Sequence, residues 1–122
     1  MANTFDWVET RVGDTGRAAA FYESLFGWQV VRKETADGSD YWIFDTGDEP
    51  RTENLRRGAL WLRSDEADLG TVPYIVVEDI DAALRKAVEL GAKVIAPKAV
   101  QGTAFKAYFT DPDGNLFGLW QE

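Results

Sequence analysis

The segment at residues 5–12 alternates side chains of different chemistry. Its odd positions carry Trp7, Glu9 and Arg11, and its even positions from residue 8 carry Val, Thr and Val. Successive side chains of a strand point to opposite faces, so Trp7, Glu9 and Arg11 share one face. A carboxylate that is desolvated beside a large ring can serve as a general base, while an arginine or tyrosine binds an oxyanion. Glu9 is therefore the candidate catalytic residue, with Arg11 or Tyr74 as its partner.

Composition excludes several other chemistries. The 122 residues include no histidine and no cysteine, so the commonest near-neutral proton shuttle and thiol catalysis are both missing. Glu9 and Asp45 are two scattered acids, which make a poor site for zinc, nickel or iron. An isolated glutamate on a strand also serves as a polar wall or dimer-contact residue, and that interpretation of Glu9 stays open.

Charge and hydropathy limit the partners. The net charge is −8 and no basic block stands out, which argues against nucleic acid because phosphate contacts need clustered Lys and Arg. No apolar run approaches the roughly 20 residues that span a bilayer. The first residues lack the layout of a signal peptide. We therefore expect a cytoplasmic protein with no nucleic-acid partner and no membrane partner.

The elements that would position these residues occur twice. Each set contains a strand, a helix that begins at an aspartate and ends at a glycine, and three further strands. The helix caps are Asp14 and Gly27 in the first set and Asp79 and Gly91 in the second. The predicted strands are 5–12, 28–31, 41–44 and 58–62, then 73–78, 93–96, 105–110 and 116–121, with turns at 36–39 and 111–115.

The two sets predict one domain over residues 1–122. Module one covers residues 5–63, a polar linker covers 64–71, and module two covers 72–122. A pattern that repeats at this long spacing indicates a structural repeat. Two unrelated units that share common caps remain the alternative.

Three segments carry a resemblance to a known family. They are residues 21–28 (FYESLFGW), residues 77–83 (VEDIDAA) and residues 111–117, which contain the turn DPDGN. With them the chain resembles the vicinal oxygen chelate superfamily, which includes glyoxalase I, extradiol dioxygenases and bleomycin resistance proteins. The resemblance implies an α+β fold. Two tandem βαβββ modules would form a cupped mixed β-sheet, with helices on the convex side, ligands in the concave side and a homodimer as the assembly.

The resemblance also implies where a divalent metal would bind. Metal-dependent members carry ligands in the first and last strand of each module. In this chain the first-strand positions are Trp7 and Val72. The position in the last strand of module two is Gly118, and the last strand of module one, residues 58–62, contains no carboxylate. A metal ion needs several convergent nitrogen or oxygen donors. We therefore expect no metal and no cofactor, and no lactoylglutathione lyase activity.

An aromatic wall is the expected ligand site. On the module interpretation, the first strands turn Trp7, Glu9, Arg11 and Tyr74 toward the cup, and the last strand turns Trp120 toward it. The candidate ligand-binding residues are Trp7, Glu9, Arg11, Trp42, Trp61, Tyr74 and Trp120. Aromatic faces hold flat rings and cations. The tryptophans could instead fill the core or a dimer interface.

These features predict a metal-independent small-molecule-binding protein of the glyoxalase/bleomycin-resistance type that sequesters a flat or cationic aromatic ligand. One alternative is a metal-free lyase- or isomerase-like enzyme with Glu9 as general base. Another is an accessory module that binds a partner protein. The ligand itself is not specified by the sequence.

Overall fold

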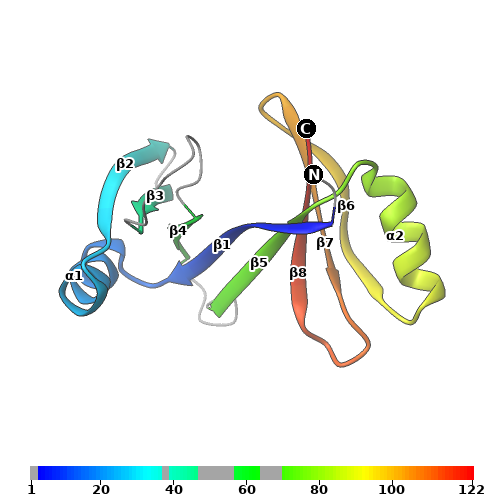
Figure 1. Cartoon of the computed structure of the whole chain (residues 1–122), viewed down its shortest axis with the longest axis horizontal. Helices are drawn as coiled ribbons and strands as arrows, with labels where there is room; N and C mark the ends of the chain where they lie inside the picture. The colour runs from blue at the N-terminus through cyan, green and yellow to red at the C-terminus, as the bar shows by residue number, and fades with distance from the viewer. Residues whose placement is uncertain (1–2, 37–38, 47–56, 64–69) are drawn as a thin grey trace. The chain divides into compact units, whose positions relative to one another are not determined.

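The structure is a computed structural model that describes residues 3–36, 39–46, 57–63 and 70–122 (Figure 1). These residues form two helices and eight strands. In chain order they are β1 (Thr4–Val12), α1 (Thr15–Phe26), β2 (Gln29–Ala36), β3 (Ser39–Asp45), β4 (Arg57–Leu62), β5 (Gly70–Val76), α2 (Ile80–Glu89), β6 (Lys93–Gln101), β7 (Ala104–Thr110) and β8 (Leu116–Gln121).

The chain divides into two compact units. The first unit is residues 7–71, and the second unit is residues 1–6 together with 72–122. The second unit thus contains all of the predicted module two, residues 72–122, together with the start of β1. Most of the predicted linker, residues 64–69, lies outside the described residues, as does the centre of the predicted turn at 36–39.

Both units have the same strand pairing. The first unit orders its strands β2-β3-β4-β1, and the second orders them β6-β7-β8-β5. In each, the two hairpin pairs are antiparallel and the pair of first and last strand is parallel. The predicted α+β fold of two tandem βαβββ modules is therefore confirmed.

The helix ends follow from their capping residues. The Asp14 side chain accepts a hydrogen bond from the Arg17 backbone N–H at 2.9 Å, and Gly27 ends α1 with φ 76°. Asp79 caps α2 in the same way through the Ala82 N–H, at 3.1 Å. These three ends were predicted correctly. The C-cap of α2 is Leu90, one residue before the predicted Gly91.

Each helix covers one face of its own sheet. In the first unit the core contains Ala19, Phe44 and Leu60. In the second, residues of α2 pack against β7 and β8, and Ile80 and Leu119 belong to this core (Figure 1). Neither helix of the described residues has the length and apolarity needed to cross a membrane.

The large apolar side chains of α1 are only partly covered by the sheet. Tyr22 packs against the first unit's core, but Phe21 and Leu25 are exposed. The helix turns a narrower face to the sheet, with Ala18, Ala19 and Tyr22 on it. The small alanines let the helix approach the strands, so the larger neighbours on the next turn are left outside.

The largest differences from the predicted strands are at the ends of β2 and β6. β2 continues to Ala36 and β6 to Gln101. Bulges interrupt both strands, between Val30 and Arg32 and between Val94 and Ala99. A bulge breaks the alternation of faces from which strand length is predicted. β6 also contains Pro97, which an edge strand tolerates.

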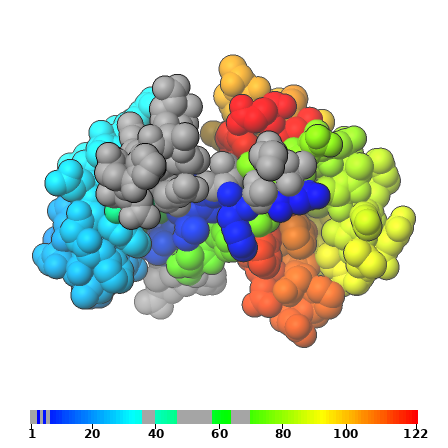
Figure 2. Space-filling model, in the orientation of Figure 1, coloured from blue at the N-terminus to red at the C-terminus, as the bar shows by residue number. Residues whose placement is uncertain are grey.

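The turn between β7 and β8 is held by the Asp111 carboxylate. The Asn115 side-chain amide donates to Asp111 Oδ2 at 2.9 Å, and the backbone N–H groups of Asn115 and Asp113 donate to Oδ1 at 2.8 and 3.0 Å. These bonds, the Asn115 side-chain bond first, hold the pKa of Asp111 below its ordinary value of 3.8. The predicted turn is confirmed, and it lies at the surface, orange in Figure 2.

The Asp111 carboxylate makes stability depend on pH. A lowered pKa means that the folded protein binds this proton less tightly than the unfolded chain. The stabilising contribution is therefore present above the ordinary pKa of 3.8 and is lost as the pH falls toward the folded-state value. We expect Asp111→Ala to lower the urea midpoint at neutral pH and to have a much smaller effect in strong acid. Asp113→Ala, whose side chain makes none of these bonds, is the control. An Asp111→Ala effect that does not change with pH would contradict this account.

Candidate functional site

One face of the first unit's sheet gathers aromatic and charged side chains. The strand register places Arg11 of β1 beside Trp61 of β4, and Trp61 beside Tyr41 of β3. Trp7 and Glu9 lie on the same face of β1 because they alternate with Arg11. The core residues Phe44 and Leu60 occupy the alternate positions of β3 and β4, so this gathering lies on the face opposite α1.

The side chains of this face contact one another. Trp7 Nε1 donates a hydrogen bond to the Tyr41 hydroxyl at 2.8 Å. The Tyr41 and Trp61 rings meet edge to face, with centroids 6.3 Å apart. The Arg11 and Arg63 Cζ atoms lie 5.4 and 4.4 Å from the centroid of Trp61. We call Trp7, Glu9, Arg11, Tyr41, Trp61 and Arg63 the Trp61 cluster.

A buried ion pair lies within the Trp61 cluster. Arg11 Nε donates to Glu9 Oε1 at 3.1 Å, and the side chains of Arg11 and Glu9 are 12% and 4% exposed. Two charges at this depth have lost most of their hydration, so each depends on its partner. The predicted base Glu9 is therefore already engaged with a guanidinium, and its catalytic role stays a prediction.

The ion pair permits a matched stability test. Glu9→Gln removes a buried charge, and we expect it to reduce the free energy of unfolding by about 3–5 kcal/mol. The control is Glu34→Gln, because Glu34 pairs with Arg32 at 2.9 Å with the same spacing along one strand, but with side chains 48% and 69% exposed. We expect the control to lose about 0–1 kcal/mol. Urea unfolding measures both variants, and equal losses would contradict this account.

The structure separates Trp42 from the Trp61 cluster. Trp42 lies on the opposite face of β3 and packs against the helix-side core. Lys33 Nζ lies 4.2 Å from the centroid of its ring. The sequence left the facing of Trp42 open, and the register of β3 with β4 decides it.

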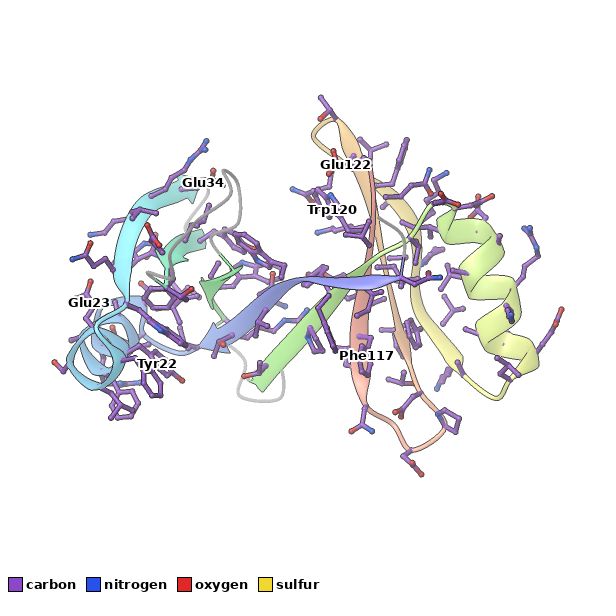
Figure 3. The ribbon with its side chains drawn as sticks, in the orientation of Figure 1. Tyr22, Glu23, Glu34, Phe117, Trp120 and Glu122 are labelled. Atoms are coloured by element: carbon purple, nitrogen blue, oxygen red, sulfur yellow. The ribbon has the colours of Figure 1, made fainter. Side chains whose placement is uncertain are left out.

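The remaining predicted residues lie in the second unit. Tyr74 of β5 stands beside Gly118 of β8, and Gly118 stands beside Tyr108 of β7. The Tyr74 and Tyr108 hydroxyls are joined by a hydrogen bond, and we call these two residues the tyrosine pair. Trp120 lies two residues along β8, where its Nε1 donates to Glu122 Oε2 at 2.7 Å (Figure 3).

The tyrosine pair depends on the absence of a side chain at Gly118. A Cβ atom there would lie 2.5 Å from Cε2 and 2.6 Å from Cδ2 of the Tyr74 ring. Real Cβ atoms do not approach a ring so closely, so a larger residue would displace Tyr74. The glycine in the central strand thus leaves room for the ring of a neighbouring strand.

This close approach can be tested with a double-mutant cycle. We expect Gly118→Ala to reduce the free energy of unfolding by about 1–3 kcal/mol, as overpacking does. In a Tyr74→Ala background the alanine at position 118 meets no ring, so the loss in free energy of unfolding should fall to a fraction of that value. Urea unfolding of the four proteins measures the coupling. Equal costs in the two backgrounds would show that the ring and the glycine are not coupled.

Comparison with known proteins identifies the family. The model of the glyoxalase/bleomycin resistance protein/dioxygenase superfamily matches residues 4–119. The chain belongs to this superfamily. Curated relatives from Mycobacterium bovis and Mycobacterium tuberculosis, both provisionally named glyoxylase CFP32, are 32% identical over 123 residues. The match covers 97% of this chain but 45% of each relative, so the chain spans less than half of their length.

Solved structures of other proteins share the fold. The hypothetical protein BH1468 from Bacillus halodurans has a TM-score of 0.73 at 16% identity, covering 100% of this chain and 96% of that one. A variant of Streptomyces coelicolor methylmalonyl-CoA epimerase in complex with 2-nitronate-propionyl-CoA has a TM-score of 0.70 at 18% identity, covering 100% and 99%. The Mycobacterium tuberculosis epimerase has a TM-score of 0.67 at 20% identity, covering 98% and 88%. At these identities the likeness establishes the fold.

The superfamily's metal does not fit the positions that the resemblance implies for it. Trp7 offers an indole that is hydrogen-bonded to Tyr41, and Val72 is buried and apolar. Gly118 is covered by the Tyr74 ring. In the part of the chain that the structure describes, no three His, Cys, Asp or Glu residues are grouped so that they could hold a metal ion. These positions therefore offer none of the donors that a divalent ion needs.

Sequence reasoning missed Tyr41, Arg63 and Tyr108. All three lie on or next to strands whose facing the sequence left undecided. The parallel register of β1 with β4 brings Arg63 beside the end of β1. There the backbone N–H of Arg63 donates a hydrogen bond to the Val12 carbonyl at 2.7 Å. Alternation places Tyr41 opposite Trp42, but the sequence left the facing of Trp42 open, so alternation alone could not assign Tyr41 to the cluster.

Proposed function

We propose that this superfamily member is a metal-independent small-molecule-binding protein whose ligand binds at the Trp61 cluster. The observation that carries the proposal is the contact of Trp61 with both Arg11 and Arg63 on the face of the sheet opposite the helix. The side chains of the cluster are half-buried or buried, so little solvent competes for them. A few polar groups among aromatic rings are typical of small-molecule sites.

The cluster favours a flat ligand that carries no positive charge. Indole rings and guanidinium planes both stack on flat conjugated molecules. Two guanidinium groups already lie against Trp61, and they would repel a cation placed on the same ring. Of the two ligand classes predicted from the sequence, the flat aromatic class therefore fits the geometry better than the cationic class.

The family supports a small molecule as the ligand. The epimerase of the same fold described above was solved in complex with 2-nitronate-propionyl-CoA. That likeness is limited to the fold, so it supports the size class of the ligand and not its identity. Sequestration of such a ligand, without chemistry on it, needs no residue beyond those of the Trp61 cluster.

A metal-free lyase or isomerase is the second candidate. The observation that favours it is the burial of Glu9, since a buried carboxylate beside a ring can act as a general base. Arg11 occupies one oxygen of that carboxylate. A substrate would therefore have to share the carboxylate with this guanidinium.

Calorimetric titration with three probes tests the proposal. We expect 2-naphthoate, which is flat and anionic, to bind more tightly than N-methylquinolinium, which is flat and cationic. Cyclohexanecarboxylate, which is not flat, should bind most weakly. Arg63→Gln should weaken 2-naphthoate binding about fivefold or more, as loss of a cation at a partly buried site does. Arg17→Gln, an exposed residue of α1, is the control.

Two outcomes would overturn the proposal. One is the absence of binding by any of the three probes, and the other is unchanged affinity in Arg63→Gln.

Dialysis against a chelator should leave the affinity for 2-naphthoate unchanged if the site needs no metal. Native mass spectrometry of the same sample should show a dimer without a stoichiometric metal ion.

A further inference from the structure

We infer that Asp40 is a positioning residue for the Trp61 cluster. Through the two hydrogen bonds of its carboxylate it fixes β3, so that Tyr41 points toward Trp7 and Trp61 on the face of the sheet opposite α1. Asp40 lies on the helix side and does not itself touch a ligand at the cluster. The inference rests on the function proposed for the Trp61 cluster, and it adds the residue through which α1 acts on the shape of that site.

The Asp40 carboxylate joins three elements of the first unit. Asp40 belongs to β3. Its Oδ2 accepts a hydrogen bond from the Thr15 hydroxyl of α1 at 3.2 Å, and its Oδ1 accepts one from the Thr35 hydroxyl of β2 at 3.0 Å. Each carboxylate oxygen is thus engaged, one by the helix and one by the neighbouring strand. Bonds to an ionised acceptor are stronger than bonds between neutral groups, so they hold the three elements together at this point.

The bond to Thr15 lies on the covered side of the sheet. Thr15 is the first residue of α1 and is 5% exposed, and Asp40 is half-buried. A buried hydroxyl that loses its acceptor costs more free energy than the bond contributes when it is made. Rotation of Asp40 away from the helix would remove the acceptor of the Thr15 hydroxyl. The geometry therefore favours one orientation of Asp40.

Tyr41 follows Asp40 along β3 and therefore points to the other face. The register pairs Asp40 with Thr35 of β2, and Tyr41 with Trp61 of β4. On the far face the Tyr41 hydroxyl accepts the Trp7 indole N–H at 2.8 Å, and its ring meets the Trp61 ring edge to face. A shift of one residue in β3 would turn Tyr41 to the helix side. The bonds that hold Asp40 on the helix side thus also hold Tyr41 in the Trp61 cluster.

The other neighbour of Tyr41 is held in a different way. Trp42 packs against the helix-side core. Its Nε1 atom is buried and has no hydrogen-bond partner in the part of the chain that the structure describes. Packing keeps Trp42 on the helix side, but it fixes direction less sharply than hydrogen bonds do. Asp40 is therefore the neighbour whose bonds define the position of Tyr41.

The indole N–H of Trp7 reports the position of Tyr41 without any ligand. Proton–nitrogen NMR detects this group, Trp7→Phe assigns its resonance, and Tyr41→Phe gives the resonance in the absence of the tyrosine hydroxyl. We expect Asp40→Ala to move the resonance toward its position in Tyr41→Phe. Its exchange with solvent should become about fivefold faster or more, as the loss of one hydrogen bond implies. The Trp120 indole N–H, which bonds to Glu122 in the second unit, should not change.

Matched variants separate hydrogen bonding from general damage to the fold. Asp40→Asn keeps an acceptor oxygen for one hydroxyl and offers an amide donor to the other, so it should restore the wild-type resonance. Glu23→Ala is the control, because Glu23 Oε2 accepts from the Val30 backbone N–H at 3.4 Å near the other end of β2. It should leave the Trp7 resonance unchanged. Urea unfolding checks each variant. Thr35→Val removes one of the two bonds at an exposed residue, and it replaces Asp40→Ala with the same expected shift if that variant does not fold.

Titration with 2-naphthoate connects Asp40 to the proposed function. Asp40→Ala should weaken binding about fivefold, whereas Asp40→Asn and Glu23→Ala should bind as the wild-type protein does. Wild-type protein that binds no 2-naphthoate overturns the function proposed for the cluster. The Trp7 resonance then decides by itself whether Asp40 positions Tyr41.

Four outcomes would overturn the inference. The Trp7 resonance could be unchanged in folded Asp40→Ala, or it could be perturbed equally by Glu23→Ala. Failure of Asp40→Asn to restore the resonance would show that the hydrogen bonds are not the cause. A shifted resonance with undiminished 2-naphthoate affinity would show that the position of Tyr41 does not matter to the ligand. A shift and a loss of affinity that are confined to Asp40→Ala and restored in Asp40→Asn support the inference.

Discussion

The parallel pairing of the first and last strand in each module is the constraint on which the candidate sites depend. β1 pairs with β4 and β5 pairs with β8, each without a direct hairpin connection. A parallel pair has to be closed by a crossover, and here the helix and the two intervening strands provide it. The pairing brings Arg11 beside Trp61 and Tyr74 beside Gly118. Residues that are tens of positions apart in the chain thus become neighbours on one face, and no local element could place them there.

The two units share one pattern of strand pairing but carry different side chains on it. In the first unit, a buried ion pair and stacked guanidinium groups surround an indole. In the second, two hydroxyls meet over a glycine. Both occupy positions where metal-dependent relatives are expected to hold an ion.

Buried polar groups give these faces their rigidity. Glu9 and Arg11 each lose hydration when the first unit folds, and their contact offsets part of that cost. The Tyr41 hydroxyl accepts a hydrogen bond from the Trp7 indole N–H, which satisfies that donor. A face made of mutually bonded side chains has few alternative arrangements, so its rings are held in fixed positions. On α1, by contrast, Phe21 and Leu25 remain exposed.

The sequence by itself determined the elements that local chemistry controls. Asp14 and Asp79 begin their helices because their side chains cap the first turn, and Gly27 ends α1 because its backbone adopts a left-handed conformation. The 111–115 turn follows from the hydrogen bonds of Asp111 with its near neighbours. Alternation along β1 likewise placed Trp7, Glu9 and Arg11 on one face. Only the tertiary structure decided which strands pair and in what register. That register placed Trp42 against the core on the helix side of the sheet, joined Tyr41 and Arg63 to Trp61, and brought Tyr108 to Tyr74. The reason is that bulges and crossovers shift faces by single residues, and a shift of one residue reverses every side chain of a strand.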